Sequence, residues 1–346
     1  MDVPYAQLKI YCKDLLSAAG MSAADADIVA QILVATSLEG VDTHGVSRLP
    51  IYLSRILNGR MNPRAVPRIT KTGPATAVVD GDNGLGQVVA VKSMETAIEL
   101  ARETGVACVT AKNSNHFGAS SYYCEMAAAE NMIGIAFTNT PSGIPPWGGR
   151  SAYFGTNPIA FAFPGDDIPI VVDMSSSVVA RGNIIQAAKE GKAIPQGWAI
   201  DDTGMPTTDA KKALSGAVLP MAGAKGYAMA LAVELFAGIL SGAAVGPHVG
   251  WIYDDKLEPA NIGHCFLAIQ VERFMPVIDF MERANAMISE IKAVPLADGC
   301  DQILIPGERR KRNAEQREQR GVPVSQALAD ELNQFAAQWN VAPLRL

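Results

Sequence analysis

Three side chains that can handle protons or anions lie four residues apart near the start of the chain: His44, Arg48 and Tyr52. In a helix this spacing places them on one face. A proline is tolerated in the first turn of a helix, so Pro50 predicts a helix start near Val46. His44 would then precede the helix, and Arg48 would lie at its positive end, where a guanidinium can grip a carboxylate. The pattern predicts a pocket with an acid–base group, a carboxylate clamp and a phenol. A capped helix with a surface arginine and a partly buried histidine is the structural alternative.

A second histidine, His116, lies in a polar loop at the end of a predicted strand. Residues 106–111 (VACVTA) have the composition of a buried strand, and the loop over 113–120 follows it. α/β enzymes commonly place reactive groups in such loops. A later strand over 168–173 ends in Asp173, which can orient a histidine and stabilise its charged form, or can cap the next segment.

Two glycine-rich turns invite comparison with nucleotide-binding loops. Residues 75–80 predict a strand, followed by the turn 81–86 and a helix to about residue 104, but the third glycine position of a Rossmann fingerprint is Val89. No acidic residue ends a second strand about twenty residues further on, so we expect no Rossmann unit here. Residues 223–226 (GAKG) open a long apolar helix and could hold a phosphate, although their spacing is not that of a Walker A loop.

Composition narrows the class of protein. Of 346 residues 49% are apolar and 18% charged, and the net charge of −6 argues against nucleic acid as a partner. Five scattered cysteines without a CxxC pair indicate reduced thiols and a cytoplasmic protein, and the first twenty residues predict no secretion signal. His248 and His264 lack neighbours at metal-ligand spacing, so we expect no metal site.

One apolar segment imitates a membrane span. Residues 226–246 are apolar apart from Glu234, whose charge would be costly in lipid. We therefore expect no membrane association and predict a helix buried inside the protein or at a subunit interface.

The chain divides into four expected units. These are a helical N-terminal unit over 1–72 carrying the substrate-site helix, an α/β segment over 73–125 that packs with the C-terminal part, a cofactor-binding α/β domain over 126–275 and a C-terminal helical segment over 276–346. Near the start, helices over 5–19 and 22–40 are expected, the second capped by Ser22 with Asp25 in the capping-box position. The basic run 309–312, interleaved with glutamates, is expected to form a solvated helix face.

Seven motifs, in order along the chain, together resemble the family of malate/L-lactate dehydrogenases of the non-Rossmann type. They are Asp42-Thr43-His44-Gly45-Val46-Ser47-Arg48, Asn115-His116-Phe117-Gly118, Thr138-Asn139-Thr140, Gly155-Thr156-Asn157-Pro158, Val172-Asp173-Met174-Ser175, Gly223-Ala224-Lys225-Gly226-Tyr227 and Pro306-Gly307-Glu308. That family also contains sulfolactate, ureidoglycolate and diketogulonate dehydrogenases and a piperideine-carboxylate reductase. The resemblance implies a homodimeric α/β fold that binds NAD or NADP and transfers a hydride reversibly between this cofactor and a small 2-oxo or 2-hydroxy acid.

The resemblance also assigns residues. His44 and His116 match histidines implicated in proton transfer, and Arg48 matches the contact to the substrate carboxylate. We expect Asp173 as a third catalytic residue and Thr43 and Tyr52 beside the substrate. The expected cofactor contacts are His116, Asn139, Thr140, Asp173, Met174, Ser175, Arg181, Lys225, Gly226, Gly307 and Glu308. Asn183 departs from the family pattern, which usually has lysine at this position.

We hypothesise that His44, oriented by Asp173, protonates the carbonyl oxygen, while His116 hydrogen-bonds that oxygen and Arg48 fixes the carboxylate. Malate, lactate and sulfolactate differ at the far end, where Arg181 or Lys225 could meet an acidic tail. A cyclic imino acid reductase and a ureidoglycolate-type dehydrogenase are alternatives within the family. From other classes, a cofactor-independent hydrolase or lyase could use the same residues but lacks an obvious nucleophile. A small-acid binding protein would need Arg48 but neither histidine.

Overall fold

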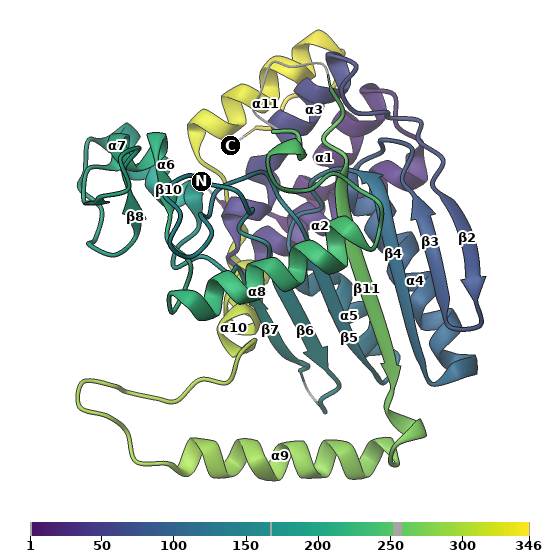
Figure 1. Ribbon diagram of the computed structural model, residues 1–346. Helices are drawn as coiled ribbons and strands as arrows, with labels where there is room; N and C mark the ends of the chain where they lie inside the picture. Colours follow the sequence, from purple (N-terminus) through teal and green to yellow (C-terminus); the bar gives the residue numbers. More distant parts are fainter. Residues whose placement is uncertain (1, 167, 252–257, 346) are drawn as a thin grey trace.

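A seven-stranded sheet in the order β2-β3-β4-β11-β5-β6-β7 forms the centre of the molecule (Figure 1). The computed structural model describes residues 2–166, 168–251 and 258–345. Its strands are β2 (Arg68–Gly73), β3 (Thr76–Asp80), β4 (Val106–Ser114), β5 (Met132–Thr138), β6 (Ile159–Phe163), β7 (Ile170–Met174) and β11 (Ile262–Gln270). β3 pairs with β4 in parallel, and the other neighbours are antiparallel. This mixed sheet is not the parallel sheet of a Rossmann domain and confirms the α/β, non-Rossmann prediction.

Two helices cover one face of the sheet. α4 (Gly86–Thr104) and α5 (Ser121–Ala129) pack alternate residues of the strands into the largest apolar core of this layer, which includes Val109, Ala136 and Phe266. The first residue of α4 is Gly86. A β-carbon at this position would lie 2.2 Å from the Asn115 carbonyl oxygen, so only glycine fits here. The glycine-rich turn before α4 thus makes room for the loop that carries His116.

The opposite face is covered by the apolar segment that imitates a membrane span. α8 (Ala224–Glu234) continues into a π-helical turn, η3 (Leu235–Ile239), and lies across the sheet in Figure 1. Its inner side packs on Ile159 and Phe137, but Leu235, Phe236, Ile239 and Leu240 are each at least 42% exposed. No helix in the described part of the chain is long and apolar enough to cross a membrane. The segment is therefore buried on one side and leaves an apolar outer face.

Both ends of the chain build one helical layer beside the sheet. α1 (Tyr5–Ala18), α2 (Ala23–Leu38) and α3 (Leu49–Leu57) share a core with α11 (Gln326–Gln338), and β1 (Asp2–Val3) pairs with β12 (Val322–Pro323). Ser22 caps α2 by accepting from the Asp25 amide, as expected. The expected 1–72 and 276–346 units thus share one core. The expected boundary at residue 125 falls inside α5, between β4 and β5 of the continuous central sheet.

Three further parts lie around this body. A small lobe contains α6 (Arg181–Glu190), α7 (Ala210–Ser215) and the short strands β8 (Ala199–Ile200), β9 (Pro206–Thr207) and β10 (Ala217–Val218). α9 (Val277–Ala293) stands clear of the sheet at the bottom of Figure 1, and α10 (Glu308–Arg320) returns the chain to the helical layer. Short turns complete the chain: η1 (Asp42–His44), η2 (Val46–Arg48), η4 (Gly246–His248) and η5 (Val271–Arg273).

Candidate active site

His44 and Arg48 lie at the ends of two successive 3₁₀ turns, η1 and η2, directly before α3. The α-helix starts at Leu49 rather than near Val46, and Pro50 lies in its first turn, as expected. Gly45 separates the two turns, and a β-carbon there would lie 2.0 Å from the Ser37 Oγ. This close packing of Gly45 against α2 fixes the orientation of η1, the turn that ends in His44.

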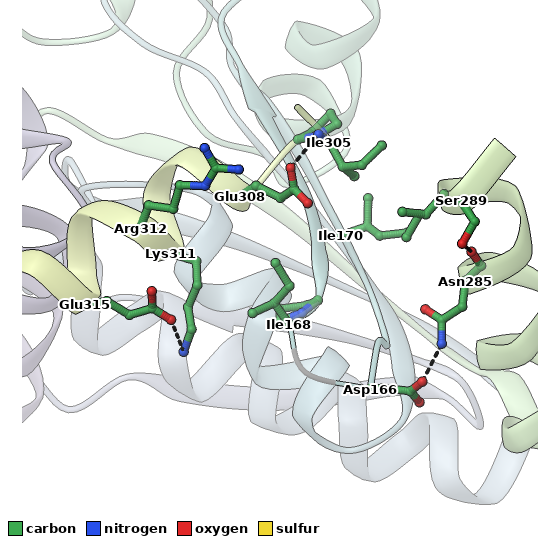
Figure 2. A pocket seen from close by; sticks show the side chains of 13 residues that line it. Asp166, Ile168, Ile170, Asn285, Ser289, Ile305, Glu308, Lys311, Arg312 and Glu315 are labelled. Carbon is green, nitrogen blue, oxygen red and sulfur yellow. Dashed lines mark hydrogen bonds and ion pairs between the residues drawn. The ribbon is translucent and has the colours of Figure 1, made fainter. Parts of the chain in front are cut away.

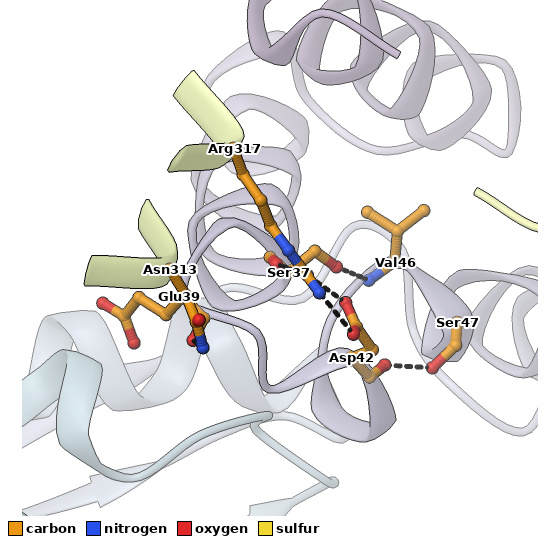
Figure 3. A network of polar contacts seen from close by, with 7 residues as sticks. All are labelled: Ser37, Glu39, Asp42, Val46, Ser47, Asn313 and Arg317. Carbon is orange, nitrogen blue, oxygen red and sulfur yellow. Dashed lines mark hydrogen bonds and ion pairs between the residues drawn. The ribbon is translucent and has the colours of Figure 1, made fainter. Parts of the chain in front are cut away.

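α10 holds this segment from the other side (Figure 3). Arg317 donates to both carboxylate oxygens of Asp42 and to the Ser37 carbonyl oxygen, while the Val46 amide donates to the Ser37 Oγ at 2.9 Å. Ser47 adds a hydrogen bond from its hydroxyl to the Asp42 carbonyl oxygen. A residue near the C-terminus therefore positions the segment that carries His44 and Arg48.

His116 stacks on His44, with ring centroids 5.6 Å apart and an interplanar angle of 26°. Its Nδ1 lies 2.6 Å from the Tyr52 hydroxyl and 3.4 Å from the Gly118 amide nitrogen. A backbone N–H can only donate, so Nδ1 is the acceptor and the neutral ring carries its proton on Nε2. Tyr52 is fully buried, contacts His116 and does not line the cavity described below, so its place beside the substrate stays a prediction.

A cavity of about 360 Å³ collects most of the predicted site residues from six separate segments. The predicted residues that line it are Thr43, His44, Arg48, His116, Asn139, Thr140, Asp173, Met174, Ser175 and Arg181. Its volume is in the range of small-molecule sites. The strand ends of β4, β5 and β7 meet at this cavity, and this is why residues so distant in sequence share it.

Four predicted cofactor residues do not line this cavity. Lys225 is exposed and Gly226 packs so tightly that a β-carbon would lie 2.2 Å from the Met221 carbonyl oxygen. Gly307, at φ +104°, begins α10 beside β7, and Glu308 lines a separate cleft of about 720 Å³ between α9 and α10 (Figure 2). There Glu308 accepts from the Ile305 amide and pairs with Lys292. A cofactor contact at these four positions stays a prediction.

Asp173 makes no direct hydrogen bond to His44, and its expected orienting role stays a prediction. Its carboxylate accepts from the Ser121 amide at 3.0 Å and pairs with Arg310 at 3.2 Å. Arg310 belongs to the basic run that was expected to form a solvated face, yet it lines the cavity and also donates to the Ser121 hydroxyl. The local sequence does not distinguish Arg310 from the other basic residues of the run. Its side chain faces the cavity because α10 packs against α2 and α5.

Burial keeps both histidines neutral. It lowers the pKa of His44 to about 4, helped by the positive charge of Arg48 and opposed by Asp173. Burial also lowers the pKa of His116 well below its usual value, again with a contribution from Arg48. Near pH 7 the positive charge of the site therefore comes from its arginines and not from its histidines. This charge suits an anionic substrate.

The cavity also fits the phosphate-bearing part of a nucleotide. α6 begins at its wall without a capping hydrogen bond from any described side chain, and Ala180, Arg181 and Gly182 line it. Nothing lies within 4 Å of the β-carbon position of Gly182, so a ligand can approach the helix start closely. A helix N-terminus beside an arginine favours an anion. Asn183 is exposed one residue further along α6.

Glu234 is a buried residue whose hydrogen bonds the sequence did not predict. It accepts from the Asn139 and Asn157 side chains at 3.1 and 2.6 Å and from the Gly246 amide at 2.8 Å. Asn157 in turn accepts from the Thr140 amide, and so Glu234 holds two loops of the cavity wall together. Glu234, the residue that argued against a membrane span, therefore supports two loops of the cavity wall.

His264 has a similar supporting place. It is fully buried, stacks on Phe117 with centroids 4.6 Å apart and bridges Ser114 and Thr138 at 2.8 Å each. Burial lowers its pKa to about 3, so it stays neutral. Its partners connect β4 and β5 at the edge that carries the cavity.

This fold and site place the chain among dehydrogenases that do not use a Rossmann domain. The family model for malate/L-lactate dehydrogenase matches residues 3–333. L-sulfolactate dehydrogenase from Methanocaldococcus jannaschii is 42% identical over 322 residues, which cover 93% of this chain and 92% of that protein. The structure of the sulfolactate dehydrogenase from that organism superposes with a TM-score of 0.92, covering 99% of this chain and 98% of that chain. The chain belongs to the malate/L-lactate dehydrogenase family, and this membership supports the dehydrogenase prediction over the hydrolase and binding-protein alternatives.

Other relatives are named for their cofactors. A (2R)-3-sulfolactate dehydrogenase (NADP(+)) from Chromohalobacter salexigens is 36% identical and covers 93% of this chain and 94% of that protein. A ureidoglycolate dehydrogenase (NAD(+)) from Escherichia coli is also 36% identical, and the match covers 85% of this chain and 84% of that protein. Nicotinamide cofactors of both kinds thus occur among relatives of this chain.

Proposed function

We propose that this protein transfers a hydride reversibly between NAD or NADP and a small 2-oxo or 2-hydroxy acid of the malate, lactate or sulfolactate type. The observation that carries the proposal is that Arg48, His44 and His116 line one cavity with a helix start suited to a phosphate. The bound nicotinamide supplies or accepts the hydride. The protein must then bind the acid's carboxylate and handle one proton at the carbonyl oxygen.

His116 is the hydrogen-bond donor to this oxygen in the proposal. Its neutral ring presents Nε2–H, because Nδ1 accepts from Gly118 and Tyr52. A neutral imidazole donates a hydrogen bond but gives up its proton reluctantly. The proton itself is therefore assigned to His44, which stacks on His116 and lines the same cavity.

Binding of the acid would prepare His44 for this step. The charge of Arg48 lowers the pKa of His44 in the ligand-free site. A substrate carboxylate paired with Arg48 cancels this effect and adds a negative neighbour, so the pKa of His44 rises. Protonated His44 then becomes available when an acceptor is bound.

Arg310 keeps Asp173 engaged beside the cavity, while Arg181 is the cation best placed for an acidic tail or a phosphate. Arg181 donates to the Ser142 and Leu214 carbonyl oxygens and stacks on Trp251 at 4.8 Å. These contacts hold the guanidinium in place at the cavity wall. A cyclic imino acid or ureidoglycolate-type substrate would use the same carboxylate clamp and differ at this side of the cavity.

The test is nicotinamide absorbance with purified protein, NADH or NADPH, and a panel of oxaloacetate, pyruvate, sulfopyruvate, oxalurate, diketogulonate and a cyclic imino acid. We expect rapid oxidation with one 2-oxo acid. His44→Ala should lower kcat by roughly 10²- to 10⁴-fold with little change in KM. Unchanged turnover of His44→Ala beside an inactive His116→Ala would exchange the two roles, and no oxidation together with no cofactor binding would refute the proposal.

We further propose that the protein is a cytoplasmic homodimer. The exposed apolar face of α8 and η3 and the projecting helix α9 support an interface with a second copy of the chain. α9 has no fully buried residue, and Ile278 and Met287 are more than half exposed. A cytoplasmic location is supported by the five free cysteines.

A further inference from the structure

Gln87 is a buried amide behind the two histidines that the proposed chemistry does not yet use. It lies in the first turn of α4 and is 0% exposed. Neither atom of its side-chain amide has a hydrogen-bond partner among the described residues. Buried amides are nearly always hydrogen-bonded, so this side chain requires an explanation.

The Gln87 amide lies beside the loop that follows His116 and near Tyr52, the residue that contacts His116. A β-carbon built on Gly118 would lie 3.8 Å from the Gln87 Nε2, which places this nitrogen beside the loop that follows His116. Burial raises the pKa of Tyr52 to about 12, and Gln87 opposes this shift as a donor to the phenolic oxygen. No regular hydrogen bond joins Gln87 to Tyr52, but the terminal torsion of a glutamine is soft enough to complete one.

The contacts of His116 define the direction that a chain of hydrogen bonds must take. The Gly118 amide and the Tyr52 hydroxyl both approach Nδ1, at 3.4 and 2.6 Å. The backbone amide fixes Nδ1 as an acceptor, so the Tyr52 hydroxyl donates to it. The Tyr52 oxygen then has lone pairs left for one further donor, and the Gln87 Nε2 is the donor on that side.

We propose that Gln87 is a positioning residue that donates to the Tyr52 hydroxyl and thereby holds His116 in the tautomer with its proton on Nε2. This inference rests on the proposed function, in which that proton faces the carbonyl oxygen. If the amide were reversed, its oxygen would accept from Tyr52, Tyr52 would no longer donate to Nδ1, and only the longer contact from the Gly118 amide, at 3.4 Å, would favour this tautomer of His116. Gln87 therefore acts on the reaction through Tyr52, without touching the substrate.

Two variants separate the donor from the shape of the side chain. Gln87→Met keeps the length and removes the donor, whereas Gln87→Glu, when ionised, offers acceptors alone. We expect kcat to fall about tenfold in both, since one hydrogen bond is lost, with KM changed less than about twofold because Arg48 is untouched. Ser93→Ala is the matched control, as Ser93 is also buried on α4 and its hydroxyl bonds to the Val89 carbonyl oxygen. It should leave kcat unchanged.

The decisive readout is the tautomer itself. Nitrogen-15 NMR of the full chain reports which imidazole nitrogen carries the proton, and the His116 signals are assigned by their loss in His116→Asn. We expect a protonated Nε2 and an unprotonated Nδ1 in the wild type, and a shift toward the other tautomer in Gln87→Glu. Unchanged His116 signals in both Gln87 variants would overturn the proposal.

A double-mutant cycle tests the route through Tyr52. Once Tyr52→Phe has removed the linking hydroxyl, Gln87→Met should lower kcat no further. A full tenfold loss in the Tyr52→Phe background would overturn the relay. A tautomer shift that leaves kcat unchanged would support the positioning role of Gln87 and count instead against the role proposed for His116.

Discussion

At the two histidines, desolvation outweighs the nearby carboxylate in setting the protonation state. Asp173 raises the pKa of His44, but burial and Arg48 lower it to about 4. A histidine that is neutral when free and charged when an anion is bound can act in both directions of a reversible reaction. The substrate, rather than a fixed aspartate, would supply the negative charge that stabilises the imidazolium.

The pH dependence of the rates follows from this. In the reducing direction we expect kcat/KM to fall as pH rises through the low pKa of free His44, about 4. kcat should fall at a higher pH, because bound substrate raises the pKa of His44. Both profiles are measured at saturating cofactor, with stability checked at each pH. Coincident profiles would contradict substrate-assisted protonation.

At the scale of elements, α10 does more than close the helical layer. Through Arg310 it reaches the cavity, and through Arg317 it holds the turn that ends in His44. The pair of Arg317 and Asp42 is partly exposed, with side chains 22% and 51% accessible. Partly exposed ion pairs contribute little stability, so its main effect should be on the position of the turn.

Arg317→Met should therefore change catalysis more than stability. We expect a free energy of unfolding lowered by less than about 1 kcal/mol. Since His44 and Arg48 lose a tether, KM should rise and kcat should fall, each several-fold. Arg102→Met is a control that removes the exposed pair with Glu130 far from the cavity. Equal kinetics for the two variants would show that the tether is not needed.

At the scale of the whole molecule, apolar surface indicates assembly. The outer face of α8 and η3 exposes several large apolar side chains side by side, and such patches mark interfaces. We expect sedimentation velocity to give the mass of two chains, and Leu235→Asp to shift the protein toward monomer. Val66→Asp, at a position 67% exposed elsewhere, is the control. A monomeric wild type would contradict the dimer.

Buried neutral histidines also make the molecule sensitive to acid. His44 and His264 have pKa values of about 4 and 3, below the unfolded value of about 6.5. At pH values between the folded and the unfolded pKa, the unfolded chain binds more protons than the folded one. The free energy of unfolding therefore falls as pH falls, by roughly 1.4 kcal/mol per pH unit for each histidine. Glu125, whose pKa is raised to about 8 by burial and by Glu39, acts in the opposite direction.

His264→Phe tests how much one histidine contributes to the pH dependence of stability. Denaturant unfolding at pH 7, 6 and 5 and constant protein concentration should show a pH dependence weaker than the wild type by about one proton. His248→Gln, at an exposed position, should retain the wild-type dependence. Identical dependences in His264→Phe and wild type would contradict the charging of His264 on unfolding.

The sequence by itself determined the chemistry-bearing motifs and most of the elements, because these depend on local spacing and periodicity. The capped start of α2, the helix α1 and the place of Pro50 all follow from residues a few positions apart. The failed Rossmann fingerprint at Val89 likewise predicted a different sheet. Seven short motifs in order were sufficient to identify the family.

Tertiary structure alone decided which groups face one another. Arg310, Glu234 and Gln87 carry no local signal, because each contacts residues on other elements that are distant in the sequence. The same holds for Asp173, which pairs with Arg310, and for Tyr52, which is buried against His116. Charge and desolvation depend on distances through space, and a linear pattern of residues does not contain those distances until the chain has folded.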